Sequence, residues 1–239
     1  MAGNEAGNTQ IAYARLAGFM FLFVIVADVF GMSMSGGYDV PGNLAETVHR
    51  MMGAELFIRV GLASGFIGSI STVLLATGLY VAVKPLDGNL ALLALIFRLT
   101  EATLGAAQSV FNFALLRLFV APDSLNVASA SQLPVLLHLQ SAANSVSVNI
   151  AAILFSLGST IFFYLFFRST YIPNALSGLG FLASPMVTIV SFVSLIAPHP
   201  SNLLKFGWLP IAAAEISVGL WLLFKGVNLR SRDTVIAAN

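Results

Sequence analysis

Six long runs of apolar residues constrain this chain most, because each is long enough to cross a bilayer as a helix. Such a helix needs about 20 mostly apolar residues. The runs lack a period of two, which favours helices over the strands of a barrel. We therefore predict an all-α integral membrane helical bundle with six transmembrane helices, forming one domain over residues 1–239. The expected spans lie near residues 11–34, 55–83, 90–120, 134–167, 173–197 and 206–227.

Composition narrows the classes of function that the chain can have. Apolar residues make up 58% of it and charged residues 9%, against about a quarter charged in soluble domains. The net charge of +1 offers no basic surface for nucleic acid. The absence of Cys excludes disulfides and thiol catalysis. No pair of His has ligand spacing, so we predict neither a metal nor a cofactor.

The connecting segments predict one surface helix and an orientation. Asn43 and Glu46 have the spacing of an N-cap pair, which predicts a short helix over residues 44–52. The first span is too long and too poor in basic residues for a cleavable signal, so we expect it to be retained. Basic residues are more numerous on the side of the termini, which predicts cytosolic termini. The two sets are Arg15, Lys84, Arg168, Lys225, Arg230 and Arg232, against Arg50, Arg117 and Lys205.

A polar stripe runs along the third predicted span. Its members recur every three or four residues and so share one helix face: Arg98, Glu101, Gly105, Gln108 and Asn112. Ionisable groups within a bilayer are costly and usually face the bundle interior with a partner. Two interpretations stay open, an ion pair that only holds the bundle together and a ligand or proton site.

Two further residues are candidates for the same site. Glu215 of the sixth span lies at a depth similar to that of Glu101, so two acids would share the base Arg98. One proton, cation or ligand amine would neutralise the excess acid. His138 begins a polar face of the fourth span that continues through Ser141, Ser145 and Asn149. A lone His is more often structural than a ligand, and this face also has the small residues of a packing seam.

A second set of charges is expected nearer the outer membrane surface. Glu55 and Arg59 are four residues apart on one helix and form a candidate ion pair. Asp28 lies about 25 Å along the first span, at 1.5 Å per residue. We therefore predict a structural group in which Arg59 pairs with Asp28 or Glu55.

Several short motifs occur in a recognisable order along the chain. They are Ala14-Arg15-Leu16-Ala17-Gly18, Leu56-Phe57-Ile58-Arg59-Val60-Gly61, Leu79-Tyr80 with Lys84-Pro85-Leu86, Phe97-Arg98-Leu99, and Phe167-Arg168-Ser169 with Tyr171-Ile172-Pro173. In these motifs the chain resembles a bacterial multi-pass membrane family known only as domain of unknown function 4386. The resemblance implies a helical bundle in the bacterial inner membrane. It implies no activity.

Three functions remain open at this level. The polar stripe favours a protein that binds or transports a small polar or amphipathic molecule, or a proton. The small size and short loops fit an accessory or structural subunit with a membrane-protein partner, or a homo-oligomer. A membrane-embedded enzyme using Glu101 or Glu215 has no supporting motif. A cavity of about 300 Å³ or more at the stripe would favour binding.

Overall fold

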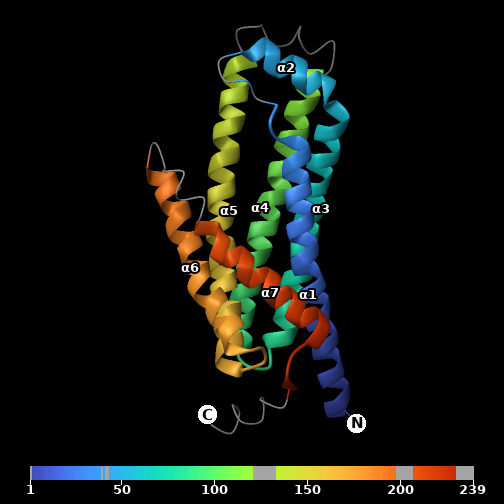
Figure 1. Cartoon of the computed structure of the whole chain (residues 1–239), viewed down its shortest axis with the longest axis vertical. Coiled ribbons are helices and arrows are strands. Elements are labelled where there is room, and N and C mark those ends of the chain that lie inside the picture. Colours follow the sequence, from blue (N-terminus) through green and yellow to red (C-terminus); the bar gives the residue numbers. More distant parts are fainter. Residues whose placement is uncertain (1, 39, 41–42, 121–132, 198–206, 230–239) are drawn as a thin grey trace.

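All of the regular secondary structure in the described part of the chain is helical. The computed structural model describes residues 2–38, 40, 43–120, 133–197 and 207–229. Its helices are α1 (Ala2–Ser35), α2 (Leu44–Gly53), α3 (Glu55–Val83), α4 (Gly88–Val120), α5 (Leu133–Ser169), α6 (Asn174–Ile196) and α7 (Leu209–Lys225). Figure 1 shows α2 lying across one end of the bundle, which we call the upper end. The first residues of α1 and the last of α7 both lie toward the lower end.

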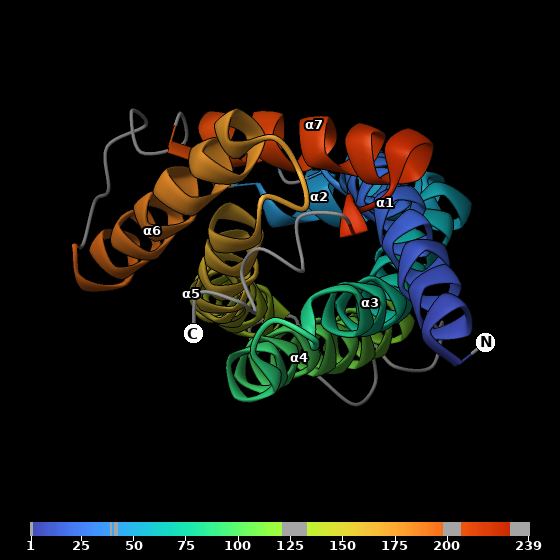
Figure 2. The same cartoon turned by 90° about the horizontal axis from the view of Figure 1, so that it is seen from below.

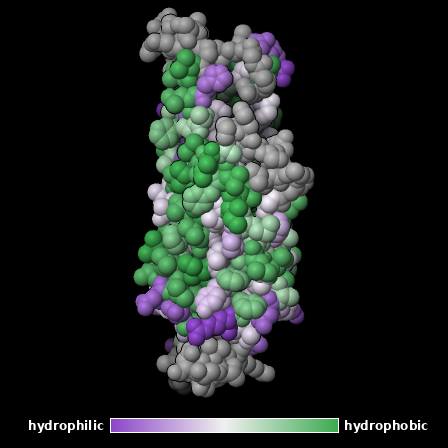
Figure 3. Space-filling model, turned by 90° about the vertical axis from the view of Figure 1, so that its left-hand side faces the viewer, coloured by the Kyte–Doolittle hydropathy of each residue, from purple (hydrophilic) through white to green (hydrophobic). Residues whose placement is uncertain are grey.

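Five of these helices are long and apolar enough to cross a membrane. They are the segments Glu5–Ser35, Glu55–Val83, Gly88–Arg117, Val135–Ser169 and Asn174–Ile196. Large apolar side chains cover their outer surfaces, including Leu182 at 70% exposure and Ile196 at 80%. Figure 3 shows hydrophobic side chains over much of one face, with hydrophilic ones toward its lower end. Such a surface is stable against lipid, which confirms the all-α membrane bundle.

The sixth predicted span is shorter than expected. Helix α7 has 17 residues, which at 1.5 Å per residue gives about 26 Å, below the roughly 30 Å of the hydrocarbon core. Gly207 and Trp208 form a separate 3₁₀ turn before it, and Gly226 ends it with a φ of +68°. The apolar run thus continues beyond the helix at both ends. In Figure 1 α7 runs obliquely across the bundle, and the predicted six long spans become five and this short helix.

Other helix boundaries differ from the predicted ones where polar residues extend a helix. Helix α3 has the predicted bounds, whereas α1 begins at Ala2 because its polar first residues are also helical. Helix α4 begins at Gly88, since the Asp87 carboxylate accepts the backbone N–H groups of Asn89 and Leu90 at 3.1 and 3.0 Å. Apolar periodicity does not detect such capped polar turns.

Small residues bring α1 and α3 into close antiparallel contact. A Cβ atom at Gly31 would lie 2.9 Å from the Gly61 carbonyl oxygen, so neither position tolerates a larger residue without movement. Ser64 donates to the Ala27 carbonyl at 2.8 Å. Near the lower end, the Gln10 side chain donates to the Ala82 carbonyl at 2.6 Å. These contacts fix the register that sets the depth of Asp28.

A second close contact places α7 against α1. A Cβ atom at Gly18 would lie 2.7 Å from the Gly219 carbonyl oxygen, and one at Gly219 would lie 3.0 Å from Phe21 Cβ. The two helices therefore cross with their backbones nearly in contact. Glu215 lies one turn before Gly219, and the crossing turns it toward the interior.

Helix α2 is the predicted surface helix. The Asn43 side chain accepts the backbone N–H of Glu46 at 3.1 Å, which confirms the expected N-cap. Arg50 pairs with Glu46 at 2.8 Å on the exposed face. The hydrogen bond and charge of Arg50 lower the pKa of the Glu46 carboxyl below its usual range.

Candidate functional site: a charged cavity in the bundle

Arg98 lies in the centre of the bundle because small residues make room for it. Its side chain is 3% exposed, and it lies on the buried face of α4 with Ala91, Ala94 and Ala102. A Cβ atom at Gly158 of α5 would lie 2.9 Å from Arg98 Cγ, so that glycine accommodates the arginine stem. The guanidinium carbon lies 4.7 Å from the centre of the Phe155 ring, in the geometry of a cation–π contact.

Arg98 and Glu101 form an ion pair on one turn of α4. Arg98 Nη1 lies 2.9 Å from Glu101 Oε2. Among the described residues, neither atom has a hydrogen-bond partner, and neither does Arg98 Nε. Buried polar atoms are nearly always satisfied by protein or by ordered water. The pair therefore has capacity for further polar contacts.

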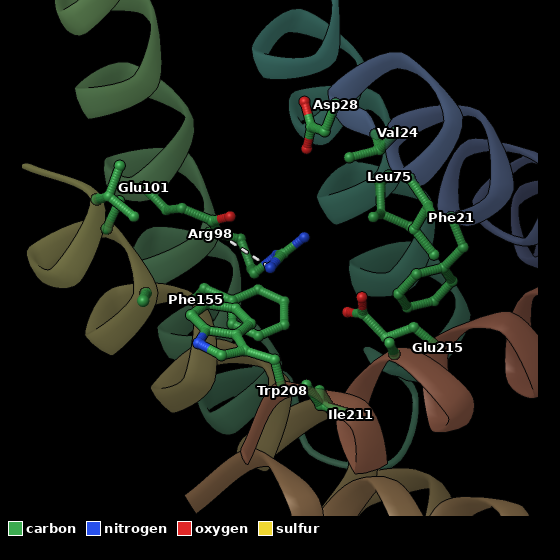
Figure 4. Close-up of a pocket in the computed structure, with 15 residues that line it drawn as sticks. Phe21, Val24, Asp28, Leu75, Arg98, Glu101, Phe155, Trp208, Ile211 and Glu215 are labelled. Atoms are coloured by element: carbon green, nitrogen blue, oxygen red, sulfur yellow. Dashed lines mark ion pairs between the residues drawn. The ribbon is translucent and has the colours of Figure 1, made fainter. Parts of the chain in front are cut away.

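Three carboxyl groups and one guanidinium surround a cavity of about 340 Å³, which we call the central cavity. Its charged residues come from three helices, with Asp28 on α1, Arg98 and Glu101 on α4, and Glu215 on α7. Figure 4 shows the carboxylates of Asp28 and Glu215 pointing toward the space occupied by the Arg98 guanidinium. The rest of the wall is largely apolar and includes Phe21, Leu75, Phe155, Trp208 and Ile211.

The charges in this cavity do not balance. Arg98 is the one basic residue among the described residues that line it. If Asp28, Glu101 and Glu215 are all ionised, the excess is two negative charges. Glu215 Oε1 is buried and has no hydrogen-bond partner within the described ranges. Removing an ion from water and burying it without a partner is unfavourable by an amount on the order of several kcal/mol. The cavity thus favours bound protons or a bound cation.

The carboxyls surround the space without converging on one point. Within the part of the chain that the structure describes, no three acidic, His or Cys side chains lie close enough to hold a metal ion. The site's geometry therefore suits a charge spread over an organic group more than a compact metal ion.

A second cavity lies between this site and the upper end of the bundle. Its volume is about 470 Å³, and we call it the upper cavity. It shares five lining residues with the central cavity: Asp28, Glu101, Val148, Ala151 and Trp208. Gln108 and Asn112 of the predicted stripe line it. Asn112 Oδ1 accepts from Gln108 Nε2 at 3.3 Å and from Gln140 Nε2 at 2.6 Å.

Comparison with known proteins places the chain in a family. The family model described as "Domain of unknown function (DUF4386)" matches residues 16–226. The chain belongs to the DUF4386 family. No curated protein and no solved structure matched it. The family description names no activity, so chemical inference rests on the cavities themselves.

His138 of this DUF4386 protein lies apart from the stripe. It is exposed near the start of α5 and lines neither cavity. The face of α5 toward the upper cavity instead carries Asn144 and Ser147. Lower on α5, the predicted small-residue seam packs on α6, where Ser156 Oγ lies in hydrogen-bond contact with Thr188 Oγ1. Polar periodicity alone did not distinguish these faces, because α5 carries polar residues on several sides.

In the DUF4386 structure, Asp28 lies apart from the other two residues of the predicted outer group of charges. Arg59 pairs with Glu55 at 2.6 Å at the upper end of α3. Asp28 lies lower, where a Cβ atom at Gly68 would collide with its Oδ1. Arg59 lies beyond the level of Ser35, the last residue of α1, since Ser35 already contacts Gly61. Depth counted along α1 alone could not reveal how far α3 extends above it.

Proposed function

We propose that this protein binds a small amphipathic organic cation in the central cavity. The observation that carries the proposal is the excess of carboxyls over basic groups among the described residues of a largely apolar, aromatic cavity. An ammonium group would lie in the open part of the cavity beside the carboxyls that Arg98 does not pair with, and its apolar substituents would pack against the aromatic wall. Aromatic faces and carboxylates together are the groups that recognise alkylammonium ligands.

The size of the cavity supports a small ligand. Its volume of about 340 Å³ is near the lower end of the roughly 300–1,000 Å³ of ligand sites. Phe155 stacks against Trp208 with ring centres 6.2 Å apart, and its ring also contacts Arg98. Arg98 thus positions both Glu101 and an aromatic wall residue.

Benzyltrimethylammonium and its uncharged isostere neopentylbenzene test the proposal as a matched pair. Calorimetric titration of detergent-solubilised protein should show binding of the cation and much weaker binding of the isostere. Glu215→Gln and Asp28→Asn keep shape but remove negative charge. Each should weaken the cation's affinity by about tenfold or more, which corresponds to about 1.4 kcal/mol. Equal affinity for the two compounds, or no effect of either variant, would refute the proposal.

We also propose a location in a bacterial cytoplasmic membrane with the lower end in the cytosol. The excess of basic residues near the lower end supports this orientation. The lower positions of the start of α1 and the end of α7 are compatible with it (Figure 1).

A structural role for part of the cluster is the second candidate. Arg98 joins α4 to α5 through its contact with Phe155 while it pairs with Glu101. An accessory subunit held together by this pair would need no ligand. Such a protein would bind neither benzyltrimethylammonium nor its isostere at the site, and would co-purify with a stoichiometric membrane partner.

A further inference from the structure

The two cavities meet at the acidic residues of the site. Asp28, Glu101 and Trp208 line both of them, so their side chains form the junction. The upper cavity is also bounded by Gly31 and Ser35 near the end of α1 and by Gly61 near the start of α3. It therefore extends from the junction toward the end of the bundle that carries α2.

The wall of the upper cavity carries several polar side chains and, among the described residues that line it, no basic one. It includes the side chains of Ser69, Thr72, Gln108, Ser109, Asn112, Asn144 and Ser147. Its charged residues, Asp28 and Glu101, are both acids at the junction. Polar groups replace part of a hydration shell, and carboxylates facing a narrow passage favour cations over anions.

We infer that the upper cavity is the route by which an organic cation reaches the central cavity from the upper side, with Asp28 and Glu101 selecting positive charge. The inference rests on the proposed function and adds the side of access and the charge selectivity. The polar face of α4 leads toward Glu101, whereas the outward residues Val110 and Phe111 of the same helix are 67% and 63% exposed.

The natural absence of Cys makes the route testable by single substitutions. Ser109→Cys and Ser147→Cys place a thiol in the upper cavity with little change of size. His49→Cys, at an exposed position on α2, marks the upper side and gives the ratio of the two reagents' rates at a thiol outside the cavity. Val110→Cys, at an outward-facing position on α4, is the matched control. The reagents are impermeant methanethiosulfonates, one with a trimethylammonium group and one with a sulfonate group. They are applied separately to intact cells and to inverted vesicles.

The expected result is modification of S109C and S147C from the same side as H49C, with V110C unmodified. The ratio of cationic to anionic rates should exceed the ratio at H49C by about tenfold, in the range known for charged clefts. Asp28→Asn should lower this ratio toward that of H49C, and it spares the buried Arg98–Glu101 pair. The inference is overturned if neither thiol reacts, if both react only from the lower side, or if the ratio equals that of H49C. Binding of benzyltrimethylammonium to the detergent-solubilised protein does not depend on the side of the membrane. A failure of the proposed binding site is therefore distinguished from a failure of the proposed access route.

Discussion

At the scale of single residues, the arrangement around Arg98 explains why an arginine is stable within the bundle. An arginine keeps its charge when buried, so the 3%-exposed side chain needs nearby negative charge. Glu101 supplies it within one turn of helix, and Phe155 supplies an aromatic face. Asp28 and Glu215 then exceed what one guanidinium can balance.

Removing Arg98 alone should damage the protein more than removing the pair. Arg98→Leu leaves Glu101 without its partner, and breaking a buried pair in this way destabilises by about 3–5 kcal/mol. Arg98→Leu combined with Glu101→Leu should recover much of that loss. Thermal unfolding in detergent measures both variants. A double variant that unfolds at a lower temperature than Arg98→Leu would contradict this account of the cluster.

Binding of benzyltrimethylammonium should strengthen as pH rises from 5 to 8. The groups facing the site are Asp28, Glu101 and Glu215, with Arg98 as the base. Protons and the ligand's fixed positive charge compete for the same carboxyls, so protonation at low pH weakens binding. Titrations at each pH check this, and Glu215→Gln should reduce the dependence. His138→Gln is the control, because His138 lines neither cavity; a pH-independent affinity would count against the site.

At the scale of helices, close contacts between small residues set the depth of each charge. Gly31 and Gly61 fix the register of α1 against α3, which brings Asp28 beside Gly68. Gly18 and Gly219 fix the crossing of α1 and α7, which directs Glu215 inward. The acids of the site thus depend on glycines that carry no chemistry themselves.

Gly18→Ala should disturb both stability and the site. Its Cβ would press on the backbone of α7, 2.7 Å from the Gly219 oxygen, and overpacking of this kind costs about 1–3 kcal/mol. The unfolding temperature and the benzyltrimethylammonium affinity should both fall. Gly53→Ala on α2 is the control, since a Cβ there meets no atom within 4 Å and Gly53 lines neither cavity. Equal behaviour of the two variants would show that the crossing does not position Glu215.

At the scale of the whole molecule, the unequal lengths of the helices determine where the two cavities lie. Helices α1, α4 and α5 have 34, 33 and 37 residues, whereas α7 has 17. The central cavity lies where α7 crosses the longer helices, and the upper cavity lies above it along α4 and α5. The protein therefore has a cavity with several polar side chains on one side of its charged centre.

The proposed orientation predicts opposite labelling at the two ends. His49 on α2 and Lys84 after α3 are both exposed and belong to the upper and lower ends. In intact cells the impermeant sulfonate reagent should modify His49→Cys but not Lys84→Cys, because the lower end is cytosolic. Permeabilisation should expose both thiols and serves as the control. Labelling of Lys84→Cys alone in intact cells would invert the proposed topology.

The sequence by itself determined the class of fold and the polar face of α4. Long apolar runs have few stable arrangements in lipid other than helices, and spacing by three and four is a local property of one helix. That spacing placed Arg98 and Glu101 on one face, and the structure shows them paired.

Depth along the helices predicted that Glu215 could join Glu101, whereas only the tertiary structure decided that Asp28 lies with these acids and not with Arg59. The position of Asp28 beside the central cavity depends on the α1–α3 register, and that of Glu215 on the α1–α7 crossing. Both follow from glycine contacts between residues far apart in the chain, which no periodicity within one helix encodes. The cavities arise for the same reason, because their volume is what remains after helices of unequal length have packed.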